Sequence, residues 1–329
     1  MAQITKPEEK IILSPSAEAA VLEALRFYDE TRAIGSDAAA SHYSTVRPFI
    51  DMREYFADFL KRSKELGRTS QMLGLFYYLL KNKQPEVAVD LCSGPGYSSA
   101  VVLNFLRPER LILIDSAPEA LEVAKGHLAE VGGKTRIEYL EARVEDLQSL
   151  QLPPADLVFM KSGMRYVRLQ DQPSVFNSVH AVLKPGGEFL FDLPLTLGGD
   201  WLPEEDDCIY PIAQAFGRVF NLPSLDKVRK EPIPSSAIER LVISGLNHAG
   251  FSVVSPVHFK REFGFAEAVS TADFYLADLF SWVRQLHPDS YRELKESEPQ
   301  LSSEIRAGLE ARFDEGMVYA GMTAFHAVK

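Results

Sequence analysis

Short apolar runs alternate with amphipathic stretches through the middle of the chain. The runs cover residues 87–90, 110–115, 136–140, 155–160 and 187–193, and they are short and rich in branched aliphatic residues, as buried parallel strands are. Between them, apolar residues recur at helical spacing over residues 97–105, 119–131 and 174–183. Strands that alternate with helices predict an α/β fold with a doubly wound, mostly parallel sheet.

Helical patterns flank this central region on both sides. Before it, the spacing predicts helices over residues 16–34, 49–60 and 70–81. After residue 194 the alternation breaks, then resumes with a helix over 236–249 and a strand over 251–259. A long helical region over 271–313 and a last strand near 317–328 complete the pattern.

This order predicts how the chain is divided. We expect an N-terminal helical cap at residues 1–84, a core at 85–195, and helical cap insertions at 196–235 and 263–314. The core continues with a helix and strand at 236–262 and a final strand at 315–329. Because sheets of this class bind ligands at the carboxyl ends of their strands, the added helices are candidates for a cover over such a site.

Composition and charge narrow the class of partner. With 46 acidic and 35 basic residues among 329, the net charge of -11 disfavours binding to a phosphate backbone, so no nucleic acid partner is expected. No apolar run reaches the roughly 18 residues that span a bilayer, and no signal-peptide pattern is present. Only Cys92 and Cys208 are cysteines. We therefore expect a cytoplasmic protein without a membrane partner.

A strand, a glycine-containing loop and a helix follow one another at residues 87–105. The strand ends near Asp90, and Gly94 and Gly96 let the backbone approach a ligand closely. A carboxylate at this strand tip would repel the pyrophosphate of a dinucleotide but suits an ammonium and a sulfonium. The third glycine of the dinucleotide motif and the Lys-Ser/Thr pair of nucleotide-binding loops are absent.

A second acid, Asp115, ends the next strand, where a carboxylate can accept hydrogen bonds from both ribose hydroxyls. Either acid alone could equally cap a helix or face solvent. Two acids at matching strand tips, on either side of the glycines, indicate a nucleoside that carries positive charge.

Four motifs together resemble the class I S-adenosylmethionine-dependent methyltransferases that act on small molecules. They are Val-Asp-Leu-Cys-Ser-Gly-Pro-Gly at 89–96, Ile-Asp-Ser-Ala-Pro-Glu-Ala-Leu at 114–121, Asp-Leu-Val-Phe at 156–159 and Val-Leu-Lys-Pro-Gly-Gly at 182–187. They stand in the family's order and at its spacing. The resemblance implies seven strands in the order 3-2-1-4-5-7-6, with strand 7 antiparallel beside strand 6.

The resemblance also implies roles for individual residues. Asp90 and the backbone of Gly94 and Gly96 would hold the methionine end of S-adenosylmethionine, Asp115 the ribose, and Ala117 would pack near the adenine. S-adenosylhomocysteine would be the product. The full expected set of cofactor-binding residues is Asp90, Cys92, Gly94, Gly96, Asp115, Ser116, Ala117, Arg143, Val144 and Lys161.

Two residues depart from the family pattern. Cys92 stands where glycine is usual, which is tolerable if the backbone there keeps a negative φ. Arg143 stands where an aspartate usually contacts the adenine amino group, and a guanidinium has no acceptor for that group. Recognition of adenine would then come from the Val144 backbone or from another acceptor.

The exit of the fourth strand, residues 161–166, faces the transferred methyl group in relatives. We expect Arg47, Ser162, Met164 and Arg165 to line the acceptor pocket, and His42, Tyr43 and Tyr166 are candidate catalytic residues. Lys161 and Arg165 could hold an anionic acceptor, or could be solvated cations near a strand end. Tyr166 could equally be a core residue.

The added segments are rich in aromatic residues, which favours an apolar pocket. We therefore expect methyl transfer to a carbon or oxygen of a small, largely hydrophobic metabolite. Alternatives are methylation of a prenyl diphosphate, a non-methylating enzyme of this fold such as an aminopropyltransferase or a cofactor-assisted cyclase, and a non-catalytic binding subunit. No metal site is expected, although a diphosphate acceptor would need a divalent ion such as Mg²⁺. A homodimer is left open.

Overall fold

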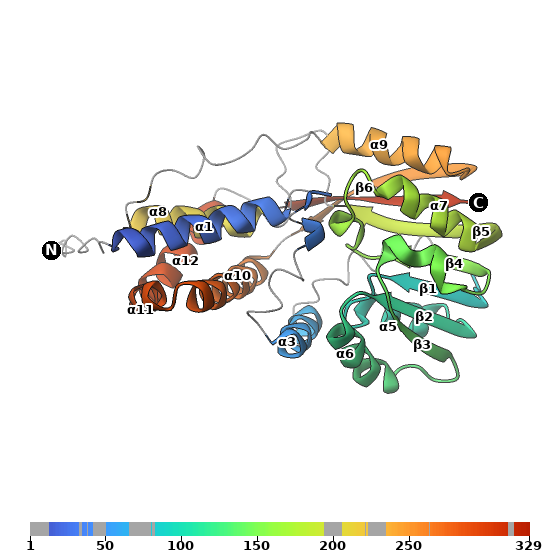
Figure 1. Cartoon of the computed structure of the whole chain (residues 1–329), viewed down its shortest axis with the longest axis horizontal. Coiled ribbons are helices and arrows are strands. Elements are labelled where there is room, and N and C mark those ends of the chain that lie inside the picture. Colours follow the sequence, from blue (N-terminus) through green and yellow to red (C-terminus); the bar gives the residue numbers. More distant parts are fainter. Residues whose placement is uncertain are drawn as a thin grey trace. The chain divides into compact units, whose positions relative to one another are not determined.

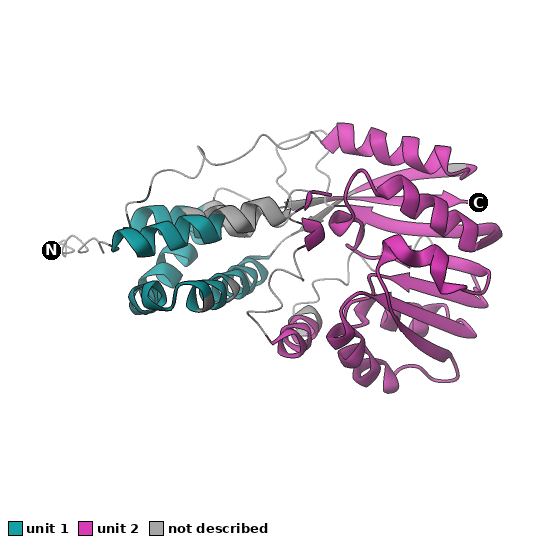
Figure 2. Cartoon of the chain, in the orientation of Figure 1, with its two compact units in different colours: residues 1–29, 204–231, 263–318 teal, residues 30–203, 232–262, 319–329 magenta. Residues whose placement is uncertain are grey.

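The computed structural model describes residues 13–32, 35–37, 39–41, 51–65, 80, 83–193, 206–220, 222, 235–262, 264–314 and 319–329 (Figure 1). The chain divides into two compact units (Figure 2). One unit takes residues 30–203, 232–262 and 319–329 and contains the sheet. The other takes residues 1–29, 204–231 and 263–318 and is helical.

The sheet has seven strands in the order β3-β2-β1-β4-β5-β7-β6. The strands are β1 (Val87–Leu91), β2 (Arg110–Asp115), β3 (Arg136–Glu141), β4 (Ala155–Met160), β5 (Leu183–Leu193), β6 (Val253–Glu262) and β7 (Tyr319–Val328). Neighbours among β1 to β5 pair in parallel, while β7 pairs antiparallel with β5 and β6. This confirms the predicted fold class and strand order. The carboxyl ends of β1 to β6 therefore share one edge, called here the carboxyl edge.

Helices cover both faces of this sheet. α5 (Tyr97–Phe105) and α6 (Pro118–Ala129) pack on one face, and α7 (Gln172–Val182) and α9 (Ser235–His248) pack on the other. Two short turns, η1 (Val144–Leu150) and η2 (Met164–Tyr166), follow β3 and β4. Before the sheet, α3 (Met52–Glu65) lies against α6.

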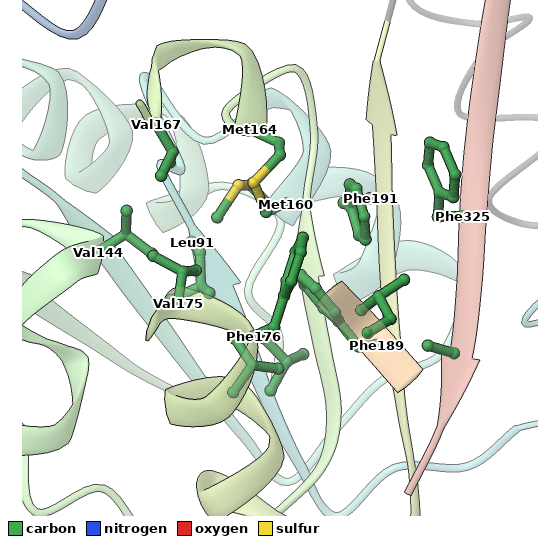
Figure 3. Packing of buried hydrophobic residues seen from close by; sticks show 14 of the residues in the cluster. Leu91, Val144, Met160, Met164, Val167, Val175, Phe176, Phe189, Phe191 and Phe325 are labelled. Carbon is green, nitrogen blue, oxygen red and sulfur yellow. The ribbon is translucent and has the colours of Figure 1, made fainter. Parts of the chain in front are cut away.

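The core on the α7 face is aromatic (Figure 3). Phe191 of β5 lies between Phe189 and Phe325, with ring centroids 4.7 and 5.0 Å away, and Phe176 of α7 is 5.8 Å from it. All four rings are almost fully buried. Burial of this size contributes about 2 kcal/mol or more for each side chain, so these rings hold β5 and β7 together and pack them against α7.

A charged cluster joins three strands at the opposite, amino edge of the sheet. The Asp156 carboxylate accepts hydrogen bonds from the backbone N–H groups of Glu86 (3.0 Å) and Val87 (2.8 Å). Lys184 Nζ lies 2.8 Å from Asp156 Oδ1 and 3.0 Å from Glu86 Oε2. These contacts give the backbone N–H groups at the start of β1 a hydrogen-bond acceptor, and they align β1 with β4 and β5.

The helical unit is built from α1 (Pro15–Arg32), α8 (Asp206–Phe220), α10 (Phe265–Leu286), α11 (Pro288–Glu296) and α12 (Glu298–Asp314). The helical region expected over residues 271–313 is divided into three helices. Pro288 has no backbone N–H to continue α10 and instead begins α11. No described helix has the length and apolar character needed to cross a membrane. The helix expected at 70–81 lies outside the described residues except Leu80.

Candidate functional site

The loop between β1 and α5 turns sharply at the carboxyl edge. Three of its residues have positive φ: Cys92 at 53°, Gly94 at 52° and Gly96 at 79°. Ser93 donates its backbone N–H to the carbonyl of Ile114 on β2 (3.1 Å), which fixes the loop to the neighbouring strand. The loop is therefore a preformed turn whose backbone is held from β2.

The condition of a negative φ at Cys92 is not met, because its φ is 53°. The turn after β1 requires the left-handed region, which costs a residue with a Cβ roughly 1–2 kcal/mol. Gly163, after β4, accommodates the Cys92 side chain. A Cβ built on Gly163 would lie 2.6 Å from Cys92 Cβ and 3.1 Å from its Sγ. Because residue 163 is a glycine, the Cys92 side chain has room that a side chain at position 163 would otherwise fill.

Asp90 lies fully buried beneath this loop. Its Oδ2 accepts hydrogen bonds from the hydroxyl groups of Ser98 (2.9 Å) and Ser99 (2.6 Å) in the first turn of α5. Its Oδ1 has no hydrogen-bond partner in the described part of the chain, and neither does the buried hydroxyl of Ser93. Burial raises the pKa of Asp90 to about 7, against the opposing effect of the two serine hydrogen bonds.

Asp115 connects β2 to the loop. Its Oδ2 accepts a hydrogen bond from Gly94 N (2.8 Å) and its Oδ1 accepts one from Ala117 N (2.9 Å). Burial raises the pKa of Asp115, while the backbone donors of Ala117, Gly94 and Ser116 oppose that rise. The Asp115 carboxylate therefore shapes the loop, and each oxygen retains a lone pair for a further donor.

The two loop glycines differ in what surrounds them. A Cβ on Gly94 would meet nothing within 4 Å, so the backbone there is uncovered. A Cβ on Gly96 would meet Ala124 Cβ at 3.1 Å and Leu128 Cδ1 at 3.2 Å, so Gly96 allows the loop to pack on α6. His127 of α6 also contacts the loop, with Nδ1 3.3 Å from the Pro95 carbonyl. Gly94 is the position that a ligand could approach.

The segment after β3 brings a carboxylate close to the loop. Arg143 points to Glu145, with Nη2 3.0 Å from Oε1, and Val144 is buried in the core. Burial raises the pKa of the Cys92 thiol well above its ordinary value, and the negative charges of Asp115, Glu145 and Asp90 raise it further. Glu145 is thus an acceptor near the site that the sequence analysis did not name.

The segment after β4 borders the loop through Gly163. Lys161 forms an ion pair with Asp192 at the end of β5, where Lys161 Nζ lies 2.9 Å from Asp192 Oδ2. Ser162 has a φ of 56°. Met164 is buried among the residues of the α7 face.

Arg165 is also buried, and its guanidinium lies 5.4 Å from the centre of the Tyr166 ring. The described residues before position 42 contact this segment: Gly35 N donates to the Arg165 carbonyl (2.8 Å), and Leu169 N donates to the Gly35 carbonyl (3.0 Å). His42, Tyr43 and Arg47 lie outside the described residues.

The structure therefore brings together some of the expected cofactor-binding residues. Cys92, Gly94, Asp115 and Ala117 are linked through direct contacts around the loop, and Asp90 lies beneath it. Ser116 is exposed at the start of α6, and the Arg143 side chain is mostly exposed. The sequence analysis missed Ser98 and Ser99, whose hydroxyls follow the loop directly. Asp192, one of two acids in β5 together with Glu188, was also missed.

Residues 88–187 match the family model described as a methyltransferase domain. A carboxy-S-adenosyl-L-methionine synthase of Klebsiella pneumoniae subsp. pneumoniae is 25% identical over 136 residues, which are 41% of this chain and 54% of the relative. A trans-aconitate 2-methyltransferase of Sinorhizobium medicae is 31% identical over 157 residues, which are 47% of this chain and 55% of the relative.

Among solved structures, a phosphoethanolamine N-methyltransferase 2 of Haemonchus contortus, in complex with phosphomonomethylethanolamine and S-adenosylhomocysteine, aligns with a TM-score of 0.46. It is 16% identical, and the alignment covers 79% of this chain and 52% of that chain. The chain spans between 20% and 55% of the length of the curated relatives that it matches.

The family match covers the glycine loop, both acids and the turn before β5. The core of this chain is a class I S-adenosylmethionine-dependent methyltransferase domain. The residues of the methyltransferase domain fit S-adenosylmethionine as its cofactor, because a buried carboxylate oxygen lacks a partner beneath an uncovered loop glycine. Among the described residues, no group of three or more histidine, cysteine or acidic side chains could hold a metal ion.

Proposed function

We propose that the methyltransferase domain binds S-adenosylmethionine along the β1–α5 loop and transfers its methyl group to a carbon or oxygen of a small, largely hydrophobic metabolite. The observation that supports this most is Asp90. A fully buried carboxyl group with a free acceptor oxygen is costly, and a cationic ligand above it would offset that cost.

In this proposal the protein binds and orients both partners. When bound, S-adenosylmethionine supplies a methyl group on a positively charged sulfur that is ready for in-line displacement. Asp115 and the Gly94 backbone hold the nucleoside against the loop, and Glu145 is a candidate acceptor for the adenine amino group. Alignment of the acceptor and exclusion of water provide most of the rate enhancement, since the leaving group is already activated.

The segment after β4 is proposed to line the acceptor side. Ser162, Met164 and Arg165 remain the proposed pocket residues together with Arg47, and Tyr166 remains a candidate for moving a proton from the acceptor. His42 and Tyr43, which lie outside the described residues, also remain candidate catalytic residues. The homodimer, the cytoplasmic location and the division into cap and core also stay proposals.

A second candidate is an enzyme of this fold that does not methylate its substrate. The relatives include carboxy-S-adenosyl-L-methionine synthases, whose name describes a modified cofactor as the product. This candidate predicts that the methyl group stays on the sulfur during turnover. The prenyl diphosphate alternative predicts turnover that a metal chelator abolishes.

The test supplies the protein with S-adenosylmethionine labelled in its methyl group and with a metabolite extract, and follows the products by mass spectrometry. The proposal predicts S-adenosylhomocysteine together with an acceptor that has gained the labelled methyl group. Label retained in a heavier cofactor would instead support the second candidate. Absence of both products, with cofactor binding intact, would contradict both and would indicate a binding subunit.

A further inference from the structure

A buried ion pair lies at the ends of β4 and β5. The Lys161 side chain is 10% exposed and that of Asp192 is fully buried. Ser162 completes the arrangement: its backbone N–H donates to Asp192 Oδ1 (2.5 Å), and its hydroxyl accepts a hydrogen bond from Lys161 Nζ. The ammonium group is therefore held in one orientation by two neighbours.

Stability alone does not account for this arrangement. Burial of two charges costs several kcal/mol of hydration for each ion, and a well-packed apolar pair of similar size is often at least as stable. Ser162 adds a second cost, because its positive φ of 56° places a residue with a Cβ in the left-handed region. Costs of this kind concentrate where a protein holds a group for a ligand.

The pair also lies beside the proposed cofactor site. Gly163, two residues after Lys161, contacts Cys92 at the start of the β1–α5 loop. Asp192 follows Leu190 by two residues in β5, and Asp90 follows Ala88 by two in β1. Leu190 and Ala88 belong to one core cluster, so both acids lie on the same face of the sheet. Lys161 therefore presents its charge at the same edge as Asp90.

An ammonium group has three N–H donors. Lys161 Nζ donates one to the Ser162 hydroxyl and pairs its charge with Asp192 Oδ2, which has no hydrogen-bond partner among the described residues, so a third donor remains beyond these two contacts. No third partner of Lys161 lies among the described residues. We propose that this third donor anchors a carboxylate-binding subsite, with Asp192 and Ser162 as its positioning residues. One fixed N–H suits one carboxylate oxygen, whereas a diphosphate needs several cations. The inference rests on the proposed function and specifies the ligand chemistry of the same site.

Two carboxylates could occupy this subsite: the one on the methionine end of the cofactor, or one on the acceptor. The test therefore uses titration calorimetry with two sets of probes. S-adenosylhomocysteine is compared with its decarboxylated analogue, and benzoate is compared with the neutral benzamide in the presence of S-adenosylhomocysteine.

The variant is the double substitution Lys161→Met with Asp192→Asn, because Lys161→Met alone would leave a buried unpaired charge. Lys134→Met, at an exposed lysine in the turn before β3, is the matched control and should leave every affinity unchanged. Thermal melting establishes that both variants are folded.

A cofactor carboxylate predicts that the Kd of S-adenosylhomocysteine rises at least about tenfold in the double variant, while that of the decarboxylated analogue does not change. An acceptor carboxylate predicts unchanged affinity for S-adenosylhomocysteine and loss of the benzoate binding that the wild type shows. The subsite is refuted if the double variant matches the wild type for all probes. Failure of the wild type to bind S-adenosylhomocysteine would instead contradict the proposed function.

Discussion

Asp90 and Asp115 occupy equivalent strand ends but differ in their surroundings. Backbone N–H groups contact both oxygens of Asp115, whereas within the described part of the chain only Oδ2 of Asp90 has partners, and these are serine hydroxyls. The Asp115 carboxylate is therefore a structural part of the loop. Asp90 keeps one oxygen, Oδ1, that can accept a hydrogen bond from a ligand. The energetic cost of burying its charged form shows in its raised pKa of about 7.

Asp90 should make the protein less stable as pH rises. Its pKa of about 7 in the folded state lies above 3.8, the value for an unfolded chain. Between these values the folded state binds the extra proton, so stability falls from about pH 4 to about pH 7 and then stays level. The Asp90→Asn variant removes this dependence. Urea unfolding at pH 5 and pH 8 should show a loss about 2 to 3 kcal/mol smaller in the variant than in the wild type. Equal losses in both proteins would contradict a buried, proton-binding Asp90.

At the level of single residues, the two acids and the glycines lie around one loop in the order that the motif gives, whereas the positive φ of Cys92 did not follow from the motif. The motif gives the order of residues, and it does not give the φ that the turn imposes at each one. The compensating Gly163 is distant in sequence and next to Cys92 in space. Asp192 was missed for a similar reason, because the partner that explains it, Lys161, follows another strand, β4, and is distant in sequence.

At the scale of elements, the sheet was predictable because each strand carries its own apolar signal. β2, β4 and α5 have the predicted bounds, since charged or turn-forming residues delimit them on both sides. β5 begins four residues earlier than predicted. Leu183 already pairs with Ala155 of β4, whereas the Lys-Pro-Gly-Gly segment after it lies where the register shifts before Glu188 pairs with Leu157. A pattern of side chains does not record such backbone pairing.

Asp156 provides a test of how the strands are aligned at the amino edge. In the Asp156→Ala variant, the N–H groups of Glu86 and Val87 lose their acceptor and Lys184 loses a partner. We expect the free energy of unfolding in urea to fall by about 2–3 kcal/mol. Asp156→Asn keeps an acceptor oxygen and should cost about 1 kcal/mol. Because this edge is opposite the loop, the affinity for S-adenosylhomocysteine should not change in either variant. Equal destabilisation by Ala and Asn would show that the hydrogen bonds to β1 contribute little.

The whole molecule combines the methyltransferase domain with a helical unit formed from three segments of the chain. Two of these segments follow β5 and β6 in sequence, and the third precedes the sheet. Sequence patterning predicted helices over residues 16–34 and 271–313, close to α1 and to α10, α11 and α12, but gave no bounds for α8. It could not show that they form a compact unit, because that depends on contacts between segments far apart in the chain, such as Ser14 with Glu293.

The central claim is that a nucleoside cofactor lies against the uncovered backbone of Gly94, and two glycines allow a matched test. Gly94 (φ 52°) and Gly133 (φ 56°) both have positive φ, and a Cβ on either would meet nothing within 4 Å. Alanine should therefore cost each position a similar strain of about 1 kcal/mol. Only at Gly94 would the new methyl group meet the cofactor.

The decisive measurement is the Kd of S-adenosylhomocysteine by titration calorimetry for the wild type, Gly94→Ala and Gly133→Ala. We predict that the Kd rises at least about tenfold in Gly94→Ala and stays within about twofold of the wild type in Gly133→Ala. Equal affinity in all three proteins would contradict the account, because the cofactor would then bind away from the β1–α5 loop.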